Sequence, residues 1–129
     1  MGFQDDYVMR TISDLVKAIA RLFLGKDNVD YDLPTNEADD TEMDSRFRRL
    51  TALAEEGNIN EAENLLFEEL DFSDPGTLPI ALAFYEHLNR FTDQELEARD
   101  YSREEIFEGV KDCAEQYGVD PQLLEAFRP

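Results

Sequence analysis

The side chains able to perform covalent or acid–base chemistry are few in this sequence of 129 residues. His87 is the only histidine and Cys113 the only cysteine. A nucleophilic cysteine needs a base within hydrogen-bonding reach. Cys113 instead falls on an apolar helical face, where cysteine behaves as a small core residue. We therefore predict no catalytic residue, and we keep an enzyme or small-molecule-binding protein with a pocket near His87 as an alternative.

The sequence also predicts no cofactor and no metal site. From Asp30 onward, acids occupy the first and third positions of a calcium-binding loop, but Thr35 and Thr41 stand where that loop requires glycine and glutamate. One histidine cannot supply the two Glu-x-x-His motifs of a di-iron bundle. Adjacent glutamates are common, but an acid–base pair needs a carboxylate removed from water, and these lie on polar faces.

The charge of the chain limits its partners. The formal net charge is −19, which disfavours binding to nucleic acid phosphates and to anionic membrane surfaces. Residues 1–26 hold four basic and three acidic residues, whereas the rest of the chain holds eight basic and 28 acidic ones. A lone cysteine and the lack of a long apolar run predict a cytoplasmic protein. An acidic mimic that binds a basic partner is a further alternative.

Residues 1–26 predict an amphipathic helix. Its apolar residues recur at helical spacing and fill one stripe, and its basic residues fall on the opposite side. Three interpretations remain open: the stripe packs on the rest of the protein, it mediates self-association, or the helix lies on a membrane surface, which the acidic body disfavours. The candidate interaction residues of this stripe are Val8, Ile12, Leu15, Ile19 and Phe23.

Residues 27–44 predict an acidic linker, and residues 45–129 a helical domain. The linker contains eight acidic residues and Pro34 but no basic residue, which is typical of a mobile, solvated tether. In the domain, a helical pattern ends at Gly57 and another begins after it, so two helices form a hairpin. Residues 78–89 are apolar nearly all round, as in a central helix. Since no segment alternates like a strand, the expected fold is all-α, a compact helical bundle without a sheet.

Two resemblances concern the same hairpin. The run Gly57, Asn58, Ile59, Ala62 and Leu66 resembles the turn and second helix of a tetratricopeptide repeat, although no second copy follows it. The chain as a whole resembles a family of small acidic bacterial proteins of unknown function, through the segments QDDYVMRTISDLVKAI, GNINEAENLL and DYSREEIFEGVKD. The family resemblance implies no activity. The repeat resemblance implies a protein-binding helix-turn-helix.

The predicted function is protein–protein interaction or self-association, with the N-terminal helix as the route to a homo-oligomer. A protein partner or a second copy is expected, and no nucleic acid. Helices after the hairpin would have to complete any binding surface, because a single repeat is too small to form one. The candidate residues for this second surface are Tyr85, Arg90, Tyr101 and Arg103.

Overall fold

The structure is a computed structural model that describes residues 3–26 and 29–128. Within these residues there are seven α-helices, one short 3₁₀ turn and no strand, so the predicted all-α fold is confirmed. In chain order the elements are α1 (Phe3–Leu24), η1 (Glu37–Asp39), α2 (Glu42–Glu55), α3 (Ile59–Glu69), α4 (Thr77–Asn89), α5 (Asp93–Ala98), α6 (Arg103–Gln116) and α7 (Pro121–Glu125).

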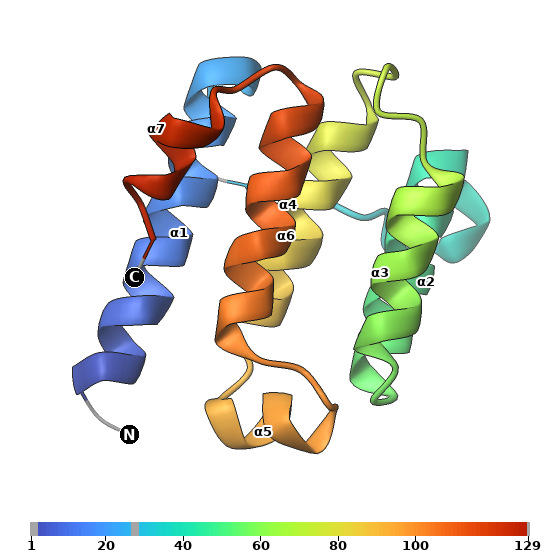
Figure 1. Ribbon diagram of the computed structural model, residues 1–129. Coiled ribbons are helices and arrows are strands. Elements are labelled where there is room, and N and C mark those ends of the chain that lie inside the picture. The colour runs from blue at the N-terminus through green and yellow to red at the C-terminus, as the bar shows by residue number, and fades with distance from the viewer. Residues whose placement is uncertain (1–2, 27–28, 129) are drawn as a thin grey trace.

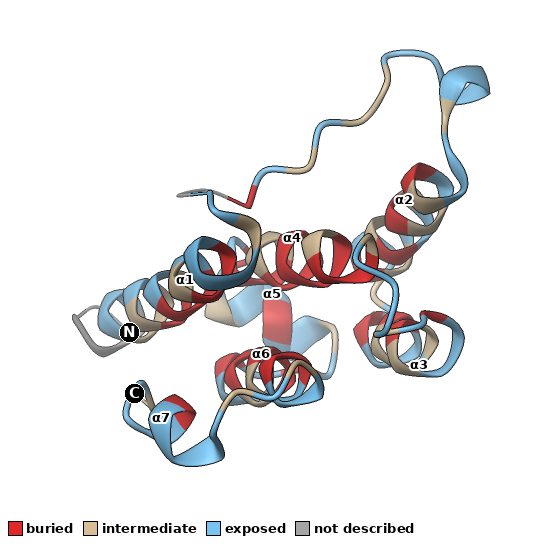
Figure 2. Ribbon diagram, turned by 90° about the horizontal axis from the view of Figure 1, so that it is seen from above, coloured by how far each residue is buried: buried red, intermediate tan, exposed pale blue. Residues whose placement is uncertain are grey.

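The helices form two layers, and α4 lies in the middle of one of them (Figure 2). Seen from above, α1, α4 and α2 lie in one row, and α7, α6 and α3 lie in the other (Figure 2). The short helix α5 closes one end (Figure 1). Every residue of α4 from Ile80 to Tyr85 is buried, because helices pack on several of its sides. The segment thus has the central position that its continuous apolar composition predicts.

The apolar stripe of α1 belongs to the same core as the rest of the chain. Ile12, Leu15 and Ile19 are buried where α1 packs against α4 and α6. Two polar contacts fix the register: Ser13 donates to Glu86 Oε2 at 3.0 Å, and the Asn89 side-chain amide donates to the Met9 carbonyl at 2.9 Å. The first of the three interpretations of this helix, packing on its own chain, is therefore what the structure shows.

The acidic segment after α1 is fastened to α2 rather than free in solution. Arg48 binds Asp40 at 2.7 Å and the Pro34 carbonyl at 2.7 Å. Tyr31 donates to Asp44 Oδ1 at 2.6 Å, and burial together with this neighbouring carboxylate raises the pKa of Tyr31 to about 12. Residues 27 and 28 of the predicted linker lie outside the described residues. The segment therefore has fixed contacts with α2 at Tyr31, Pro34 and Asp40, which composition does not reveal, whereas residues 35–39 are exposed to solvent.

The hairpin turns at Gly57, as predicted. Its φ of +95° is a left-handed conformation that glycine adopts without a steric penalty. After the turn, Ile59, Ala62 and Leu66 are all fully buried. At the start of α3, Asn58 makes no side-chain capping hydrogen bond. The end of α2 is instead secured by Arg99, which donates to the carbonyls of the last helical turn.

Candidate functional site

The two residues most able to do covalent chemistry have different surroundings. His87 Nε2 lies 3.0 Å from Glu55 Oε1 near the surface. Cys113 is fully buried in α6. Burial, and to a lesser degree the nearby charges of Asp112 and Glu63, raise the pKa of its thiol, so the reactive thiolate is disfavoured. Within the described ranges no group of three or more metal-ligating side chains is arranged to hold an ion.

The second candidate surface predicted from the sequence is not a surface. Tyr85 is fully buried, and Tyr101 and Arg103 are only 5% and 9% exposed. Arg90 alone of the four is exposed, and its guanidinium lies 3.5 Å from Asp30. The physical reason is that each of the three buried side chains has polar partners inside the protein, which a sequence reading could not supply.

Two of those side chains share one carboxylate. Tyr85 and Tyr101 both donate to Glu63 Oε2, at 2.5 Å and 2.8 Å. Burial raises the pKa of Glu63, although the two phenol hydrogen bonds act in the opposite direction. Burial and the anionic neighbour raise the pKa values of both tyrosines. The cluster joins α3 to α4 and to the loop before α6, which is a structural role.

Arg103 ties together the ends of three helices. Its guanidinium donates to the Asn89 carbonyl at 2.8 Å, to the Phe91 carbonyl at 2.8 Å and to Asp93 Oδ1 at 2.7 Å. The side chain of Asn89 connects this network to α1 through the Met9 carbonyl. A planar guanidinium suits such a set of acceptors because its donors point in fixed directions.

The predicted stripe of α1 is divided between the core and the surface. Ile12, Leu15 and Ile19 are in the core, as described, and Val8 is half-buried. Phe23 is 39% exposed, and its ring centroid lies 5.7 Å from that of Tyr117 at the end of α6. Self-association through the three buried members of the stripe is therefore wrong, because α4 and α6 already cover them.

What remains exposed and apolar lies on α1 and on the C-terminal segment. In the described part of the chain, every large hydrophobic side chain that is exposed belongs to one of these two segments. The two helices are neighbours on the same side of the bundle (Figures 1 and 2). We call this set the apolar surface; its members are Tyr7, Leu22, Phe23, Leu123 and Phe127.

Local sequence signals place α7 next to this surface. Gly118 has a φ of +86°, which ends α6 and turns the chain back. Asp120 then accepts a hydrogen bond from the Gln122 amide and caps α7. Within α7, Leu124 is buried whereas Leu123 is 64% exposed. Phe127 lies in the turn that follows α7 and is 36% exposed.

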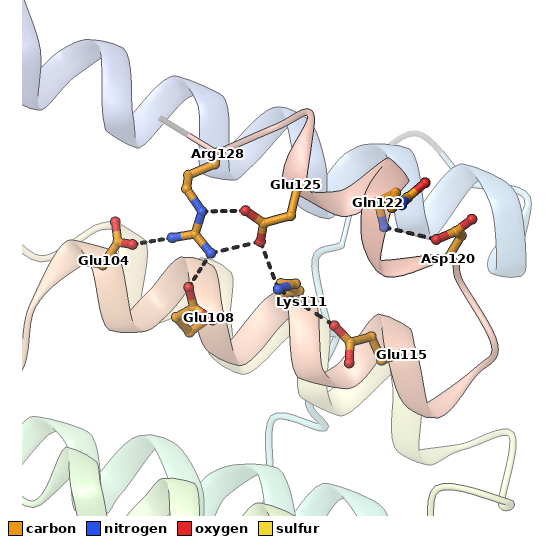
Figure 3. Close-up of polar contacts among 8 residues, drawn as sticks. All are labelled: Glu104, Glu108, Lys111, Glu115, Asp120, Gln122, Glu125 and Arg128. Carbon is orange, nitrogen blue, oxygen red and sulfur yellow. Dashed lines mark hydrogen bonds and ion pairs between the residues drawn. The ribbon is translucent and has the colours of Figure 1, made fainter.

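Charges of opposite sign flank the apolar surface. The solvent side of α1 carries the exposed residues Arg10, Lys17 and Arg21, which at 100° per residue lie within about 40° of one another. The α7 side is acidic, with carboxylates on α6 and α7 gathered around two cations (Figure 3). The residues of this ionic cluster are Glu104, Glu108, Lys111, Glu115, Glu125 and Arg128.

Arg128 is the centre of the ionic cluster. It pairs with Glu104, with Glu108 at 2.5 Å and with Glu125 at 2.7 Å. Lys111 binds Glu125 on the other side at 2.7 Å. Hydrogen bonds from Arg128 and Lys111 lower the pKa of Glu125 to about 2, and the carboxylates raise the pKa of Arg128. The cluster connects α7 to α6.

Sequence reasoning missed the C-terminal half of the apolar surface. Leu123 and Phe127 are not among the candidate interaction residues predicted from the sequence, because apolar side chains in a helix usually face the core. A five-residue helix has room to bury few of them. The adjacent pair Leu123 and Leu124 was the available signal, since neighbours lie about 100° apart around a helix and a short helix with a narrow contact to the protein buries only one of them.

The chain belongs to a family of unknown function, DUF6483, whose model matches residues 2–118. The match covers most of the chain and confirms the resemblance to a family without an assigned activity. No curated protein and no solved structure matches the chain. The likeness of the hairpin to a tetratricopeptide repeat stays a prediction. No helix in the described residues is both long and apolar enough to cross a membrane.

Proposed function

We propose that this member of the DUF6483 family is a self-associating protein that forms a two-fold dimer through the apolar surface on α1 and α7. The observation that carries the proposal is the gathering of the exposed large hydrophobic side chains on these two segments. Exposed apolar patches on a soluble domain are typical of protein interaction sites. Tyr7, Phe23 and Phe127 also provide aromatic contacts, which are enriched at such interfaces.

The charge distribution supports a second copy as the occupant. The first 26 residues have a net charge of +1, whereas the remainder has −20. Two copies that meet through α1 and α7 therefore bring the least acidic segment of the chain into the contact. Contact through any strongly acidic face would instead oppose association by like-charge repulsion.

The flanking charges also suit a two-fold arrangement. In an isologous interface the same patch meets itself, rotated by half a turn. If the axis runs between the α1 half and the α7 half, the basic flank of one copy faces the acidic flank of the other. Arg10, Lys17 and Arg21 then lie opposite carboxylates of the α6–α7 side. Such complementarity fixes the orientation of partners more than it adds affinity.

Substitutions on the surface test the proposal better than deletion of α1, because α1 is part of the core. Leu22→Glu and Leu123→Glu each place a charge on an exposed position of the apolar surface. Ala52→Glu is the matched control, since Ala52 is exposed on α2, outside the surface. Circular dichroism should show that all three variants fold.

Sedimentation equilibrium from about 1 μM to about 1 mM protein then covers the range of weak and moderate dissociation constants. We expect a monomer–dimer equilibrium for the wild type and for Ala52→Glu, and monomers for both leucine variants. A wild type that stays monomeric over this whole range contradicts the proposal. So does a dimer that both leucine variants retain.

A further inference from the structure

The helix α7 depends on its contacts with α6 for its position. It has only five residues, Pro121–Glu125, far fewer than the roughly 12–15 that an isolated helix needs to be even marginally stable in water. Leu124 is its one buried side chain. The apolar contact of α7 with the core is thus small, and polar contacts must supply much of the attachment.

The acidic residues around α7 would repel it if no cation were present. Glu104 and Glu108 are one turn apart on α6, and Glu125 of α7 faces the same place (Figure 3). Like charges at such spacing are destabilising. With Arg128 present, the contact between α6 and α7 is attractive, because one guanidinium contacts all three carboxylates.

Arg128 also has an apolar contact that defines its place. Its Cζ atom lies 4.8 Å from the centroid of the Phe107 ring, in a cation–π arrangement. Phe107 is fully buried in α6. The guanidinium is therefore held between a ring of the core and three carboxylates, which sets the position of the backbone next to it. That backbone includes Phe127, a member of the apolar surface.

We propose that Arg128 is the positioning residue of the apolar surface: it holds α7 on α6 so that Leu123 and Phe127 stand beside α1, and self-association requires it. This inference rests on the proposed function and adds to it. In the absence of Arg128, Lys111 alone still pairs with Glu125, while Glu104 and Glu108 have no cation between them and Glu125 and repel it. The attachment of α7 is then too weak to keep its half of the surface in place.

The test compares Arg128→Gln with Arg49→Gln in the full-length chain. Both variants lose one positive charge, but Arg49 is exposed on α2, outside the ionic cluster and the apolar surface. Two measurements are needed: sedimentation equilibrium for self-association, and amide hydrogen exchange of residues 119–128 for the attachment of α7. Amide exchange reports local opening of a segment without unfolding of the whole protein.

For Arg128→Gln we expect exchange in residues 119–128 to be at least about tenfold faster, and the dissociation constant of the dimer to rise by at least about tenfold, equivalent to 1.4 kcal/mol. Arg49→Gln should match the wild type in both. A monomeric wild type overturns the proposed function and this inference together. A dimeric wild type with an equally dimeric Arg128→Gln overturns this inference alone. A monomeric Arg128→Gln whose exchange is unchanged also overturns it, because Arg128 would then contact the second copy directly.

Discussion

Gly109 of α6 lies directly against the ring of Tyr85 of α4. A Cβ atom at position 109 would fall far inside van der Waals contact with Cζ, Cε1 and Oη of that ring. The absence of a side chain at 109 therefore allows Tyr85 to cross α6 and reach Glu63 on α3. The two-layer packing and the buried carboxylate cluster both depend on this one close approach.

We expect Gly109→Ala to destabilise the protein by about 2 kcal/mol, because overpacking as close as this costs about 3 kcal/mol. The helix preference of alanine, about 1 kcal/mol better than glycine, offsets only part of this. Urea denaturation followed by circular dichroism measures the difference. In a Tyr85→Leu background the same substitution should be neutral or stabilising, because the ring is gone. Equal destabilisation in both backgrounds would show that the ring contact is not the cause.

The raised pKa of Glu63 predicts that the stability of the protein depends on pH. Burial raises its pKa above the usual 4.5, so the folded state holds the proton more tightly than the unfolded state. Stability is therefore lost as pH rises from the unfolded pKa through the folded one. Glutamine at this position has no proton to lose, and its carbonyl oxygen still accepts from the two tyrosines.

We accordingly expect the stability of Glu63→Gln relative to the wild type to be greater at pH 7 than at pH 4. Urea denaturation at the two pH values measures this difference. Glu61→Gln, at an exposed position of the same helix, accounts for the loss of one negative charge. If the relative stability of Glu63→Gln is the same at both pH values, or is greater at pH 4, the carboxylate is not held in the way the structure indicates.

Replacement of Arg103 should be among the most damaging single changes. Arg103→Ala removes the donor of the Asn89 and Phe91 carbonyls, and each buried acceptor left unsatisfied costs about 1–3 kcal/mol. Loss of the ion pair with Asp93, whose side chain is 41% exposed, adds less. Arg103→Lys keeps the charge but cannot reach all of these acceptors, so an intermediate loss of about 2 kcal/mol is expected. Chemical denaturation measures both. Arg90→Ala, which removes an exposed pair with Asp30, should change stability by less than about 0.5 kcal/mol.

The thiol of Cys113 should react only when the protein unfolds. It is fully buried and burial raises its pKa, so neither access nor ionisation favours attack on a disulfide reagent. The labelling rate with such a reagent should rise with urea in parallel with the unfolded fraction. A cysteine introduced at the exposed Ala52 position should react without urea. Rapid labelling of Cys113 in the native protein would mean that α6 opens locally.

The elements of the fold were largely predictable because each has a local cause. The glycine stops, the capping residues and the helical spacing of apolar residues predict where helices begin and end, and the continuous apolar run of α4 predicts its central place. The partner of α1 was not predictable. An amphipathic stripe has the same spacing whether it packs on its own chain, on a second copy or on a membrane, and the contacts of Ser13 and Met9 that decide this lie 73 and 80 residues away.

The candidate site, unlike the elements of the fold, was poorly predictable from the sequence. Tyrosine and arginine are common at interfaces, which made Tyr85, Tyr101 and Arg103 reasonable surface candidates. Their burial depends on Glu63, Asn89 and Phe91, and no local pattern pairs them with these partners. Leu123 and Phe127 were missed because the shortness of α7, and not the type of its residues, keeps them outside.

The long separation in sequence between α1 and its partners has a consequence during synthesis. A chain leaves the ribosome from its N-terminus at about 5–20 residues per second, so α1 precedes the completed α6 by roughly 5–20 seconds. Over that time its apolar stripe, which packs on both α4 and α6 in the fold, is not fully covered. The nascent helix then presents apolar side chains that the finished fold buries. Docking onto α4 and α6 covers these side chains. The synthesis of α6 therefore sets the time at which the new chain is protected from non-specific apolar contacts.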